Sequence, residues 1–247
     1  MPIGHAFIEL ESVDSTNNYA MARAAEGRAS HGTLYFAYEQ WAGKGQRGRT
    51  WTSTPGENIV LSAVIEPVAL TFSQAFALSA CVALACHDLF SRYAGASVTR
   101  IKWPNDIYWN DRKAGGILIE NSFRGTDWVL AIAGMGININ QTDFPESAGH
   151  PVSLRQITSQ SFDVVGLARE LGECLDRRYS ELTAGAGAAP VIGDYNDRLY
   201  RRNETVRLKK ENAVFETMVK GVSAQGQLLT KDVMDRQFTF GEVEWII

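Results

Sequence analysis

Apolar positions along this chain first predict a series of strands. Short apolar or alternating runs occur near residues 5–12, 33–40, 58–66, 98–103, 106–110, 114–123 and 127–138. Such runs, bounded by Gly, Pro, Asn or Asp, are typical of strands. The connections at 110–113 and 124–126 are short, which favours antiparallel hairpins. The pattern therefore predicts a mixed, largely antiparallel sheet.

Longer periodic segments predict helices near residues 16–25, 71–93, 163–182 and 190–201. Asp14, Ser15 and Thr16 offer oxygens for an N-cap before the first helix. Thr71 and Gln74 fit a capping box at the second helix, which is apolar nearly all round and is expected to be buried. Because strands and helices do not alternate regularly, the expected fold class is α/β of the α+β kind rather than a doubly wound fold.

Near residue 200 the sequence pattern changes from helices to short strands. Residues 183–189 are mostly Ala and Gly and are typical of a flexible connector. From about residue 206 the segments are short and strand-like, with glycine at the turns. We expect a catalytic domain over 1–200 and a small β domain over 201–247.

Composition narrows the class of protein. The 247 residues are 45% hydrophobic and 21% charged, as in an ordinary globular protein. The formal net charge of -4 argues against extensive binding to nucleic acid. The N-terminus lacks signal-peptide features, and no continuous apolar run reaches the roughly 18 residues of a membrane span. Cysteines such as Cys81 and Cys86 are expected to be small core residues in a reducing compartment, so we expect a cytoplasmic protein without membrane contact.

Residues 43–51, Gly-Lys-Gly-Gln-Arg-Gly-Arg-Thr-Trp, are the first candidate for ligand chemistry. Three glycines, three cations and an indole follow an expected strand. Glycine lets a backbone approach a ligand closely, and Lys and Arg bind phosphate or carboxylate. The indole of Trp51 offers a flat face for a base. We expect this loop to hold a nucleotide and a second anion.

Two familiar phosphate-binding loops fit the segment poorly. Gly43, Gly45 and Gly48 match a dinucleotide-binding fingerprint, but that fingerprint needs a helix starting at the loop. Residues 50–56 are poor helix formers. The P-loop pattern is also absent from the sequence. A mobile hairpin with solvated charges is the alternative for the loop taken alone.

Two other strand ends carry similar chemistry. Residues 100–106, Arg-Ile-Lys-Trp-Pro-Asn-Asp, interrupt an apolar strand pair, and Lys113 precedes Gly115 and Gly116 at the next strand. Residues 134–140 again end an apolar strand with glycines and amides. Three strand ends with such residues predict one convergent site, and three unrelated turns are the alternative.

In this order and spacing, these segments resemble the biotin protein ligases. The matching elements are Ser-Thr-Asn at 15–17, the glycine–arginine loop ending in Trp at 43–51, Lys-Trp-Pro-Asn-Asp at 102–106, Lys-x-x-Gly-Ile-Leu at 113–118 and Gly-Ile-Asn at 136–138. The small C-terminal β domain also fits, so the resemblance covers essentially the whole chain.

The resemblance implies a catalytic domain like that of class II aminoacyl-tRNA synthetases, followed by an SH3-like β-barrel. It also implies that biotin and ATP, with Mg²⁺ as counter-ion, give biotinyl-5′-adenylate and pyrophosphate. The adenylate would then acylate one lysine of a biotin carboxyl carrier protein, a subunit of acetyl-CoA carboxylase. Because the biotin carboxylate is already ionised, the first step needs positioning and charge stabilisation rather than a general base.

The resemblance implies roles for individual residues as well. Lys113 would contact the biotin carboxylate and the α-phosphate, with Lys44, Arg47 and Asp106 as further catalytic residues. Biotin would be bound by Ser15, Thr16, Asn17, Gln40, Gly43, Lys44, Gly45, Gln46, Lys113, Gly115 and Gly116. ATP would be bound by Arg47, Arg49, Trp51, Asn105, Asp106, Lys113 and Asn138, with the indole of Trp51 stacked on adenine. No residue is assigned directly to a metal.

Some positions have a structural alternative. Ser15 could serve only as a helix N-cap and Trp51 as a core residue, whereas Trp103 is expected to pack the turn. The basic residues between 198 and 210 are expected to form a solvated interdomain face, with a docking surface for an acidic carrier as the alternative.

The loop departs from the family pattern at two positions. Lys44 and Gln46 stand where the family usually has cations of the arginine type. Lys44 keeps the charge but loses the bidentate fork, and Gln46 loses the charge. Since this region would shield the bound adenylate, these changes bear on how well the intermediate is retained.

Other functions are less favoured. A biotin-responsive DNA-binding regulator would need an N-terminal helix-turn-helix, and only about seven residues precede the first strand motif, so we expect no nucleic-acid partner. A non-catalytic biotin-binding module would not need Lys113. Lipoate or octanoate ligases share the fold and are the nearest alternative, but residues 43–51 and 102–106 favour biotin. The sequence leaves monomer or homodimer open.

Overall fold

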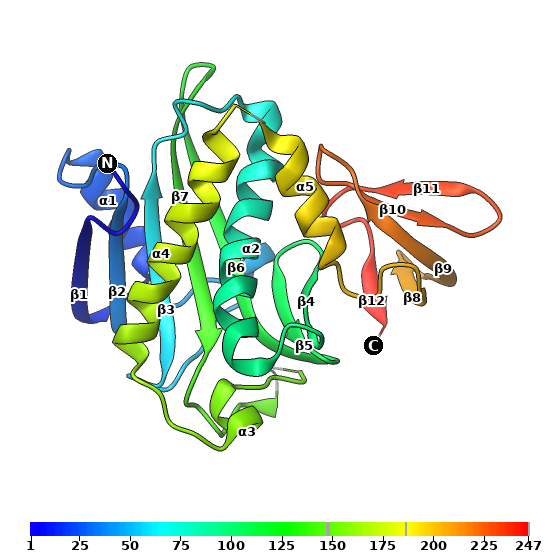
Figure 1. Cartoon of the computed structure of the whole chain (residues 1–247), viewed down its shortest axis with the longest axis horizontal. Coiled ribbons are helices and arrows are strands. Elements are labelled where there is room, and N and C mark those ends of the chain that lie inside the picture. The colour runs from blue at the N-terminus through cyan, green and yellow to red at the C-terminus, as the bar shows by residue number, and fades with distance from the viewer. Residues whose placement is uncertain (147–148, 186, 247) are drawn as a thin grey trace.

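The computed structural model describes residues 1–146, 149–185 and 187–246, and a seven-stranded sheet forms its centre (Figure 1). In spatial order the strands are β1 (Ala6–Val13), β2 (Thr33–Gln40), β3 (Asn58–Ile65), β7 (Asp127–Asn138), β6 (Arg112–Arg124), β5 (Asp106–Trp109) and β4 (Thr99–Lys102). The β1–β2 pair is parallel and the other neighbouring pairs are antiparallel. The predicted mixed, largely antiparallel sheet is confirmed.

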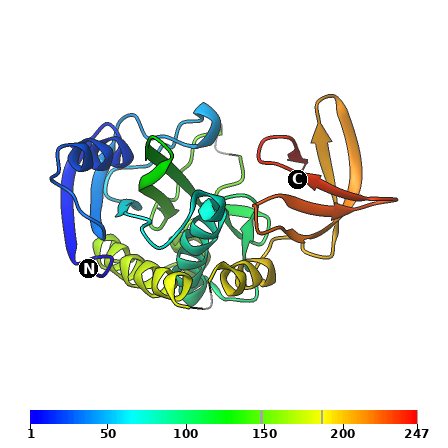
Figure 2. The same ribbon diagram turned by 90° about the horizontal axis from the view of Figure 1, so that it is seen from above.

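Helices cover both faces of this sheet. They are α1 (Thr16–Ala25), α2 (Ala75–Ala94), α3 (Leu154–Thr158), α4 (Val164–Thr183) and α5 (Ala188–Asp197). Figure 2 shows α1 on one face and α2 and α4 on the other. Successive side chains of β2 point to opposite faces of the sheet. Leu34 and Phe36 therefore join the main core, while Tyr35 packs in a second cluster with Ala20 of α1.

Helix α2 is the buried centre of the main core. The backbone N–H of Thr71 donates to Oε1 of Gln74 at 3.0 Å, which confirms the capping box, and a single 3-10 turn, η2 (Phe72–Gln74), leads into the helix. By length and composition, Phe72–Ala94 is a candidate membrane span, although it contains no long uninterrupted apolar run. However, 61% of its most apolar window is buried inside the protein, and a core helix meets the same criteria.

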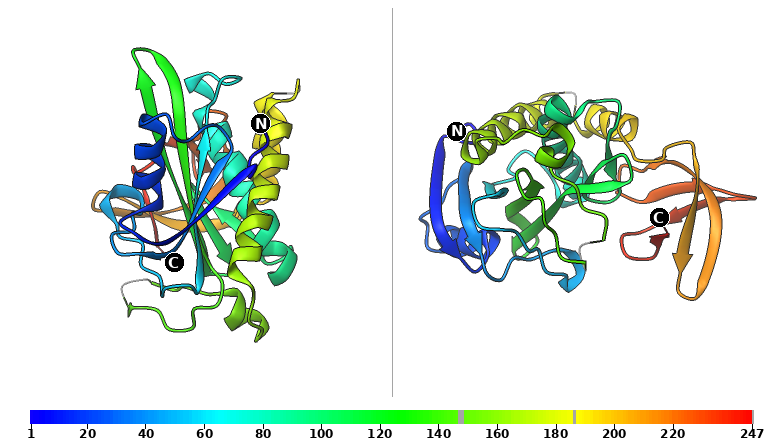
Figure 3. Two further views of the ribbon diagram at one scale, coloured as in Figure 1. Left: turned by 90° about the vertical axis from the view of Figure 1, so that its left-hand side faces the viewer. Right: turned by 90° about the horizontal axis from the view of Figure 1, so that it is seen from below.

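A second sheet follows α5. In spatial order its strands are β11 (Asp235–Phe238), β10 (Leu228–Lys231), β9 (Ala213–Val222), β8 (Thr205–Lys210) and β12 (Glu244–Ile246). It forms a separate layer beside the larger sheet (Figure 3). All its pairs are antiparallel, and its edge strands β11 and β12 do not pair with each other in the residues described. The sheet therefore fits SH3-like architecture without closing into a barrel.

Two side chains fasten the second sheet to the main body. The indole Nε1 of Trp103 donates to the carbonyl of Gly226 at 2.9 Å. The amide of Asn196 in α5 both donates to and accepts from the backbone of Val222, at 3.0 and 2.7 Å. Trp103 is 2% exposed, so the expectation that it packs the turn is confirmed, and it joins the two sheets as well.

Three local features differ from the sequence prediction. Helix α5 ends at Asp197 instead of continuing to 201, because the next residues pair with β4: Ile101 exchanges backbone hydrogen bonds with Arg198 and Tyr200 at 2.8 and 2.9 Å. The short helix α3 was not predicted, since five residues are too few to show a helical period. The 3-10 turn η1 (Gln46–Gly48) inside the glycine loop was not predicted either.

Candidate active site

Two adjoining cavities bring the three predicted segments together. The inner cavity, of about 60 Å³, is lined by Ser15, Thr16, Asn17, Gln40, Lys44, Gly45, Gln46, Trp51, Val60, Asn105, Asp106, Lys113, Gly116, Ile117, Leu118, Gly134, Met135 and Gly136. The outer cavity, of about 520 Å³, has the size of a small-molecule site. Besides the loop and the 102–106 turn, its walls include Asn138, His150 and, from the C-terminal segment, Phe240, Gly241, Val243, Glu244 and Trp245. The predicted convergence of three strand ends is confirmed.

Six residues belong to both cavities and form the wall between them. They are Gly45, Gln46, Trp51, Asn105, Asp106 and Lys113. A molecule in one cavity and a molecule in the other would therefore meet at the same side chains. All six were predicted as site residues from the sequence.

The glycine loop folds back as an irregular hairpin over these cavities. Lys44 pairs with Thr50 in an antiparallel bridge, and the N–H of Gly45 donates to the carbonyl of Arg49 at 2.7 Å. Arg47 adopts a left-handed conformation at φ 56°, followed by Gly48 at φ 74°. This tight turn explains the glycine there, and it exposes the side chains of both Arg47 and Arg49 to the outer cavity.

A chain of hydrogen bonds lines the closed end of the inner cavity. Oε1 of Gln40 accepts from the backbone N–H and the hydroxyl of Thr16, at 2.7 and 3.0 Å. The hydroxyl of Ser62 lies 2.7 Å from Oγ1 of Thr16 and 2.6 Å from Oδ1 of Asn17. Nδ2 of Asn17 donates to Glu120 at 2.8 Å. The inner cavity thus ends in a set of mutually oriented donors and acceptors.

Ser15 belongs to the same end of the inner cavity. It occupies the N-cap position of α1, but its side chain makes no capping hydrogen bond there. The residue is 2% exposed and lines the cavity. The alternative that Ser15 is only a helix cap therefore does not account for its hydroxyl.

Lys113 is held at the wall between the cavities by its neighbours on β5 and by the loop before α3. Its Nζ lies 2.7 Å from Oδ1 of Asp106. Its backbone N–H donates to His150 at 2.7 Å, and its carbonyl accepts from Val152 at 2.8 Å. Nδ2 of Asn138 donates to the carbonyls of both Lys113 and Val152, at 3.3 and 3.2 Å. In this arrangement Asn138 supports the backbone around Lys113.

Two polar atoms at the shared wall have no hydrogen-bond partner among the described residues. They are Nε1 of Trp51 and Oε1 of Gln46, both shielded from solvent. Buried polar atoms are normally paired, so these two are suited to a ligand. The indole of Trp51 lies against Gly136, where an added Cβ would be 2.5 Å from its Cε2 atom. Trp51 is therefore a wall of the site rather than a plain core residue.

Two predicted glycines lie less directly on the cavities, whereas Lys44 lines the inner one. Gly43 and Gly115 line neither of them: a Cβ on Gly43 would overlap the carbonyl of Trp51, and one on Gly115 would lie 2.6 Å from Cδ1 of Ile137. Both glycines therefore permit close packing of the walls. Nζ of Lys44 donates to Asn18 at 2.5 Å and lies 3.7 Å from Glu120.

The basic residues between 198 and 210 are largely engaged in local ion pairs. Arg198 pairs with Asp194, Arg202 with Asp197, and Lys210 with Glu242. Arg201 pairs with Asp111 and Glu204. The expected solvated face between the two sheets fits these exposed pairs better than a free docking surface does.

Sequence reasoning missed several residues of the site. Ser62 is the one hydroxyl in the buried strand β3, and that exception to an apolar run was a usable signal. Glu120 and Tyr108 lie on strands whose apolar pattern drew attention away from them, whereas Lys102 stands in the recognised 102–106 motif but was given no role of its own. Trp245 comes from the second sheet, and no local pattern indicates that it reaches the outer cavity.

Comparisons with known proteins agree with this geometry. Residues 9–138 match the model of the Biotin/lipoate A/B protein ligase family. The bifunctional ligase/repressor BirA of Escherichia coli is 30% identical over 249 residues, which cover 97% of this chain and 74% of that protein. The biotin–[acetyl-CoA-carboxylase] ligase of Paracoccus denitrificans is 32% identical over 237 residues, covering 92% and 95%.

A solved structure agrees as well. The biotin protein ligase of Aquifex aeolicus in complex with biotin and ATP superposes with a TM-score of 0.81 at 24% identity, over 98% of this chain and 99% of that one. At that identity, the likeness supports the fold.

Proposed function

Because the chain belongs to the biotin/lipoate A/B protein ligase family, we propose that it joins biotin to AMP and then transfers the biotinyl group to a carrier lysine. The carrier is the biotin-bearing subunit of acetyl-CoA carboxylase, as the name of the Paracoccus relative indicates for that enzyme. The enzyme is thus an adenylate-forming ligase that uses ATP and biotin as substrates.

One observation carries this proposal: the two cavities share the wall that contains Lys113. The inner cavity suits biotin and the outer cavity suits ATP. The carboxylate of biotin and the α-phosphate of ATP would then meet beside Lys113 and Gln46, where both cavities are bounded. Two reactants held in adjoining sites react as if within one molecule, which lowers the entropic barrier.

The first step brings two anions together, and the residues at the wall can offset their repulsion. The carboxylate oxygen of biotin attacks the α-phosphorus, a P–O bond to the β-phosphate breaks, and pyrophosphate leaves. The Lys113 ammonium can stabilise charge on both the carboxylate and the α-phosphate, while Arg47 and Arg49 face the outer cavity from the loop. No proton has to be removed from biotin in this step.

Mg²⁺ enters as the counter-ion of ATP. Within residues 1–146, 149–185 and 187–246, no group of three or more His, Cys, Asp or Glu side chains is arranged to hold a metal on its own. Mg²⁺ bound with ATP is coordinated mainly by phosphate oxygens and water. Asp106 and Glu244 are carboxylates that border the cavity where such an ion would arrive.

The polar end of the inner cavity favours biotin over lipoate or octanoate. Biotin carries a ureido ring with donors and an acceptor, which the set around Thr16, Asn17 and Gln40 can match. An octanoyl chain or a dithiolane offers this set neither matching donors nor an acceptor. Sites built to hydrogen-bond a substrate reject analogues that lack the matching groups, by a factor of about 10⁴ or more in favourable cases.

We further propose that the protein acts without nucleic acid, in the cytoplasm, as a monomer or homodimer. The net charge of -4 and the three buried free cysteines support the first two points. A gel shift with promoter DNA, with and without biotin, tests the first. Fractionation of cells tests the second, and sedimentation at several protein concentrations distinguishes monomer from dimer.

Biotin-dependent exchange of pyrophosphate into ATP tests the proposed function. The exchange is measured separately with biotin, lipoate and octanoate as the acid. We expect exchange with biotin alone. Exchange that does not need biotin, or no exchange with any acid, would contradict the proposal, and exchange with lipoate or octanoate would support the alternative ligase.

A further inference from the structure

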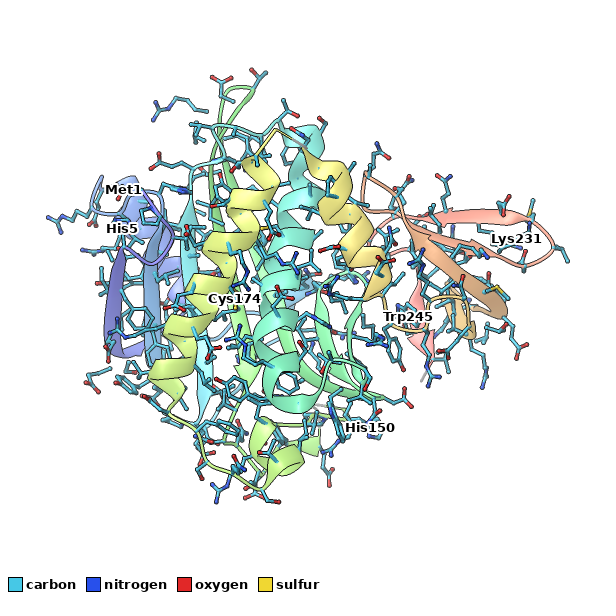
Figure 4. The ribbon with its side chains drawn as sticks, in the orientation of Figure 1. Met1, His5, His150, Cys174, Lys231 and Trp245 are labelled. Carbon is cyan, nitrogen blue, oxygen red and sulfur yellow. The ribbon has the colours of Figure 1, made fainter. Side chains whose placement is uncertain are left out.

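Lys102 lies at the end of β4 and lines the outer cavity, yet none of the roles above uses it. Its Nζ makes one hydrogen bond, to the hydroxyl of Tyr108 at 3.2 Å. The same Nζ lies 4.8 Å from the centre of the Tyr108 ring and 5.7 Å from that of Trp245. Figure 4 labels Trp245 where the second sheet meets the main body. Two aromatic rings, one from each sheet, thus enclose an ammonium group at the cavity wall.

Lys102 has no carboxylate partner among the residues described, although three carboxylates border the same cavity. Asp106 pairs with Lys113, and Asp111 accepts from Tyr200 and Arg201, at 2.6 and 2.7 Å. Glu244 borders the cavity from β12. An ammonium has three N–H donors, and Tyr108 takes one. The other two remain for a ligand.

The surroundings disfavour a charge on Lys102 in the free protein. Burial lowers the pKa of Lys102 to about 8; Asp106 opposes this shift, and Lys113 and Arg49 add to it. Burial, with Asp106 next, raises the pKa of Tyr108 well above its usual range, so that its hydroxyl stays neutral. An anion in the cavity would raise the pKa of Lys102 again, because an opposite charge nearby favours the ammonium form.

We propose that Lys102 binds the phosphates of ATP and that Trp245 of the second sheet positions it for this role. The inference rests on the proposed use of ATP. Lys102 would contact the triphosphate from the side of the cavity formed by β4, β5 and β12. Arg47 and Arg49 would contact it from the loop. The second sheet thereby becomes part of the nucleotide site.

The proposal has a measurable consequence: nucleotide binding takes up a proton. Because the pKa of Lys102 is lowered to about 8, a substantial share of its side chains are neutral amines at pH 8. Phosphate binding converts them to the ammonium form, each by addition of one proton from the buffer. At pH 6 the side chain is already charged, and no uptake through Lys102 is expected.

Titration calorimetry in two buffers of different ionisation enthalpy measures this uptake. The protein is saturated with biotin, and the ligand is an ATP analogue with a methylene group between the α- and β-phosphates, so that no adenylate forms. For the native protein we expect a measurable proton uptake at pH 8 that is absent at pH 6. In Lys102→Met the uptake should vanish, and the analogue should bind about tenfold or more weakly, as for the loss of a charged hydrogen bond.

Lys102→Arg is the matched control for charge. Arginine stays protonated at pH 8, so this variant should show no uptake while it keeps most of the affinity. In steady-state kinetics Lys102→Met should raise the KM for ATP and leave the KM for biotin unchanged. If Lys102 had only a structural role, Lys102→Arg would not lose the proton uptake while keeping the affinity.

Trp245→Leu tests the positioning role. Removing the indole that covers the Lys102 ammonium should raise the pKa of Lys102 toward that of a free lysine. The proton uptake at pH 8 should then be lost although Lys102 is present. The affinity should fall less than in Lys102→Met. Ile246→Ala changes the next residue of the same strand, which points to the opposite face, and should alter neither quantity.

The outcomes separate this proposal from the proposed function. Equal proton uptake and equal affinity in the native protein and Lys102→Met would overturn the role of Lys102. If Lys102→Met does not fold, the uptake in Lys102→Arg decides: undiminished uptake overturns the proposal and lost uptake supports it. Absence of biotin-dependent pyrophosphate exchange, with nucleotide binding still dependent on Lys102, would contradict the proposed function and leave this inference standing. Failure of the native protein to bind the analogue would overturn both.

Discussion

The Lys113 ammonium and the Asp106 carboxylate lie 2.7 Å apart at the wall shared by the two cavities. They come from neighbouring strands, β6 and β5, whose register shifts between Ile107 and Tyr108. The backbone of Lys113 is also fixed by His150 and Val152 on the opposite side. These contacts hold the flexible side chain of Lys113 so that it points toward the place where the reacting groups would meet.

Lys113→Ala should abolish adenylate formation while leaving the fold intact. Among the described residues, Lys113 is the one cation that borders both cavities, and loss of a preorganised charge-stabilising group costs about 10²–10³ in kcat. Biotin-dependent pyrophosphate exchange measures the loss, and thermal unfolding checks the fold. Lys220→Ala, at an exposed lysine on β9, is the control and should retain full activity. Near-native exchange by Lys113→Ala would show that the catalytic assignment is wrong.

Much of the larger sheet could be predicted because its strands carry their own signals. The connection expected at 110–113 is the turn at Asn110 and Asp111 between β5 and β6, two residues shorter than predicted, and Thr71 marks the start of the α2 region. The end of α5 could not be predicted, because Arg198 leaves the helix to pair with Ile101, far away in sequence. Local propensity does not report such competition for backbone hydrogen bonds.

The site was predictable where its residues stand in compact motifs and not elsewhere. Lys113, Asp106 and Trp51 interrupt apolar strands or follow glycines, so they are visible in the sequence. Lys102 stands in such a motif too, but only the fold shows that Trp245 covers it. Contacts between the two sheets depend on tertiary packing, which periodicity and spacing do not describe.

Gln46→Arg should slow the release of biotinyl-adenylate. Nε2 of Gln46 donates to the carbonyl of Ile117 at 3.3 Å, and its Oε1 is buried without a partner. A guanidinium there would give the phosphate of the intermediate a charge-assisted hydrogen bond, worth about a tenfold slower release. The off-rate of the adenylate from the purified complex measures this. Gln46→Met, similar in length but uncharged, is the control, and an off-rate unchanged by Gln46→Arg would refute the prediction.

Arg178→Ala should destabilise the main body strongly. Arg178 of α4 contacts Asp88 of α2 at 2.7 and 3.1 Å and Asp194 of α5 at 2.8 Å, and it is 9% exposed. Removing one partner of a buried ion pair costs about 3–5 kcal/mol, because the other charge is left unpaired. Urea unfolding at pH 7 measures the change. Arg177→Ala is the matched control: Arg177 lies 3.7 Å from the same carboxylate but is half-exposed, so it should cost less than about 1 kcal/mol.

The same ion pair predicts a loss of stability in acid. Burial alone would raise the pKa of Asp88, but His87, whose Nδ1 lies 3.7 Å from the carboxylate, and the hydrogen bonds from Arg178 outweigh it and hold the pKa well below its usual range. The group therefore contributes stability above the unfolded-state pKa of about 3.9, and this is lost as the pH falls through the folded-state pKa. Unfolding free energies measured from pH 6 to pH 2 should decline more steeply for the native protein than for Arg178→Ala. Parallel curves would contradict this account.

Gly134 and Gly136 lie two residues apart on β7, on the same face of the sheet, and both line the inner cavity, but each gives room to a different side chain. A Cβ on Gly134 would overlap Oδ1 of Asn17, which accepts from Ser62 at the closed end of the inner cavity. A Cβ on Gly136 would lie 2.5 and 2.6 Å from two ring atoms of Trp51. The two glycines should therefore affect the two substrates separately.

Gly134→Ala should raise the KM for biotin and Gly136→Ala the KM for ATP, each by about ten- to hundredfold, as expected when a binding group is displaced by roughly an ångström. Steady-state exchange rates at varied biotin and varied ATP separate the two effects. Gly193→Ala, in α5 with open space around its Cα, is the control and should change neither constant. If both variants raised both constants equally, the damage would lie in the shared sheet, and the division into a biotin cavity and an ATP cavity would be wrong.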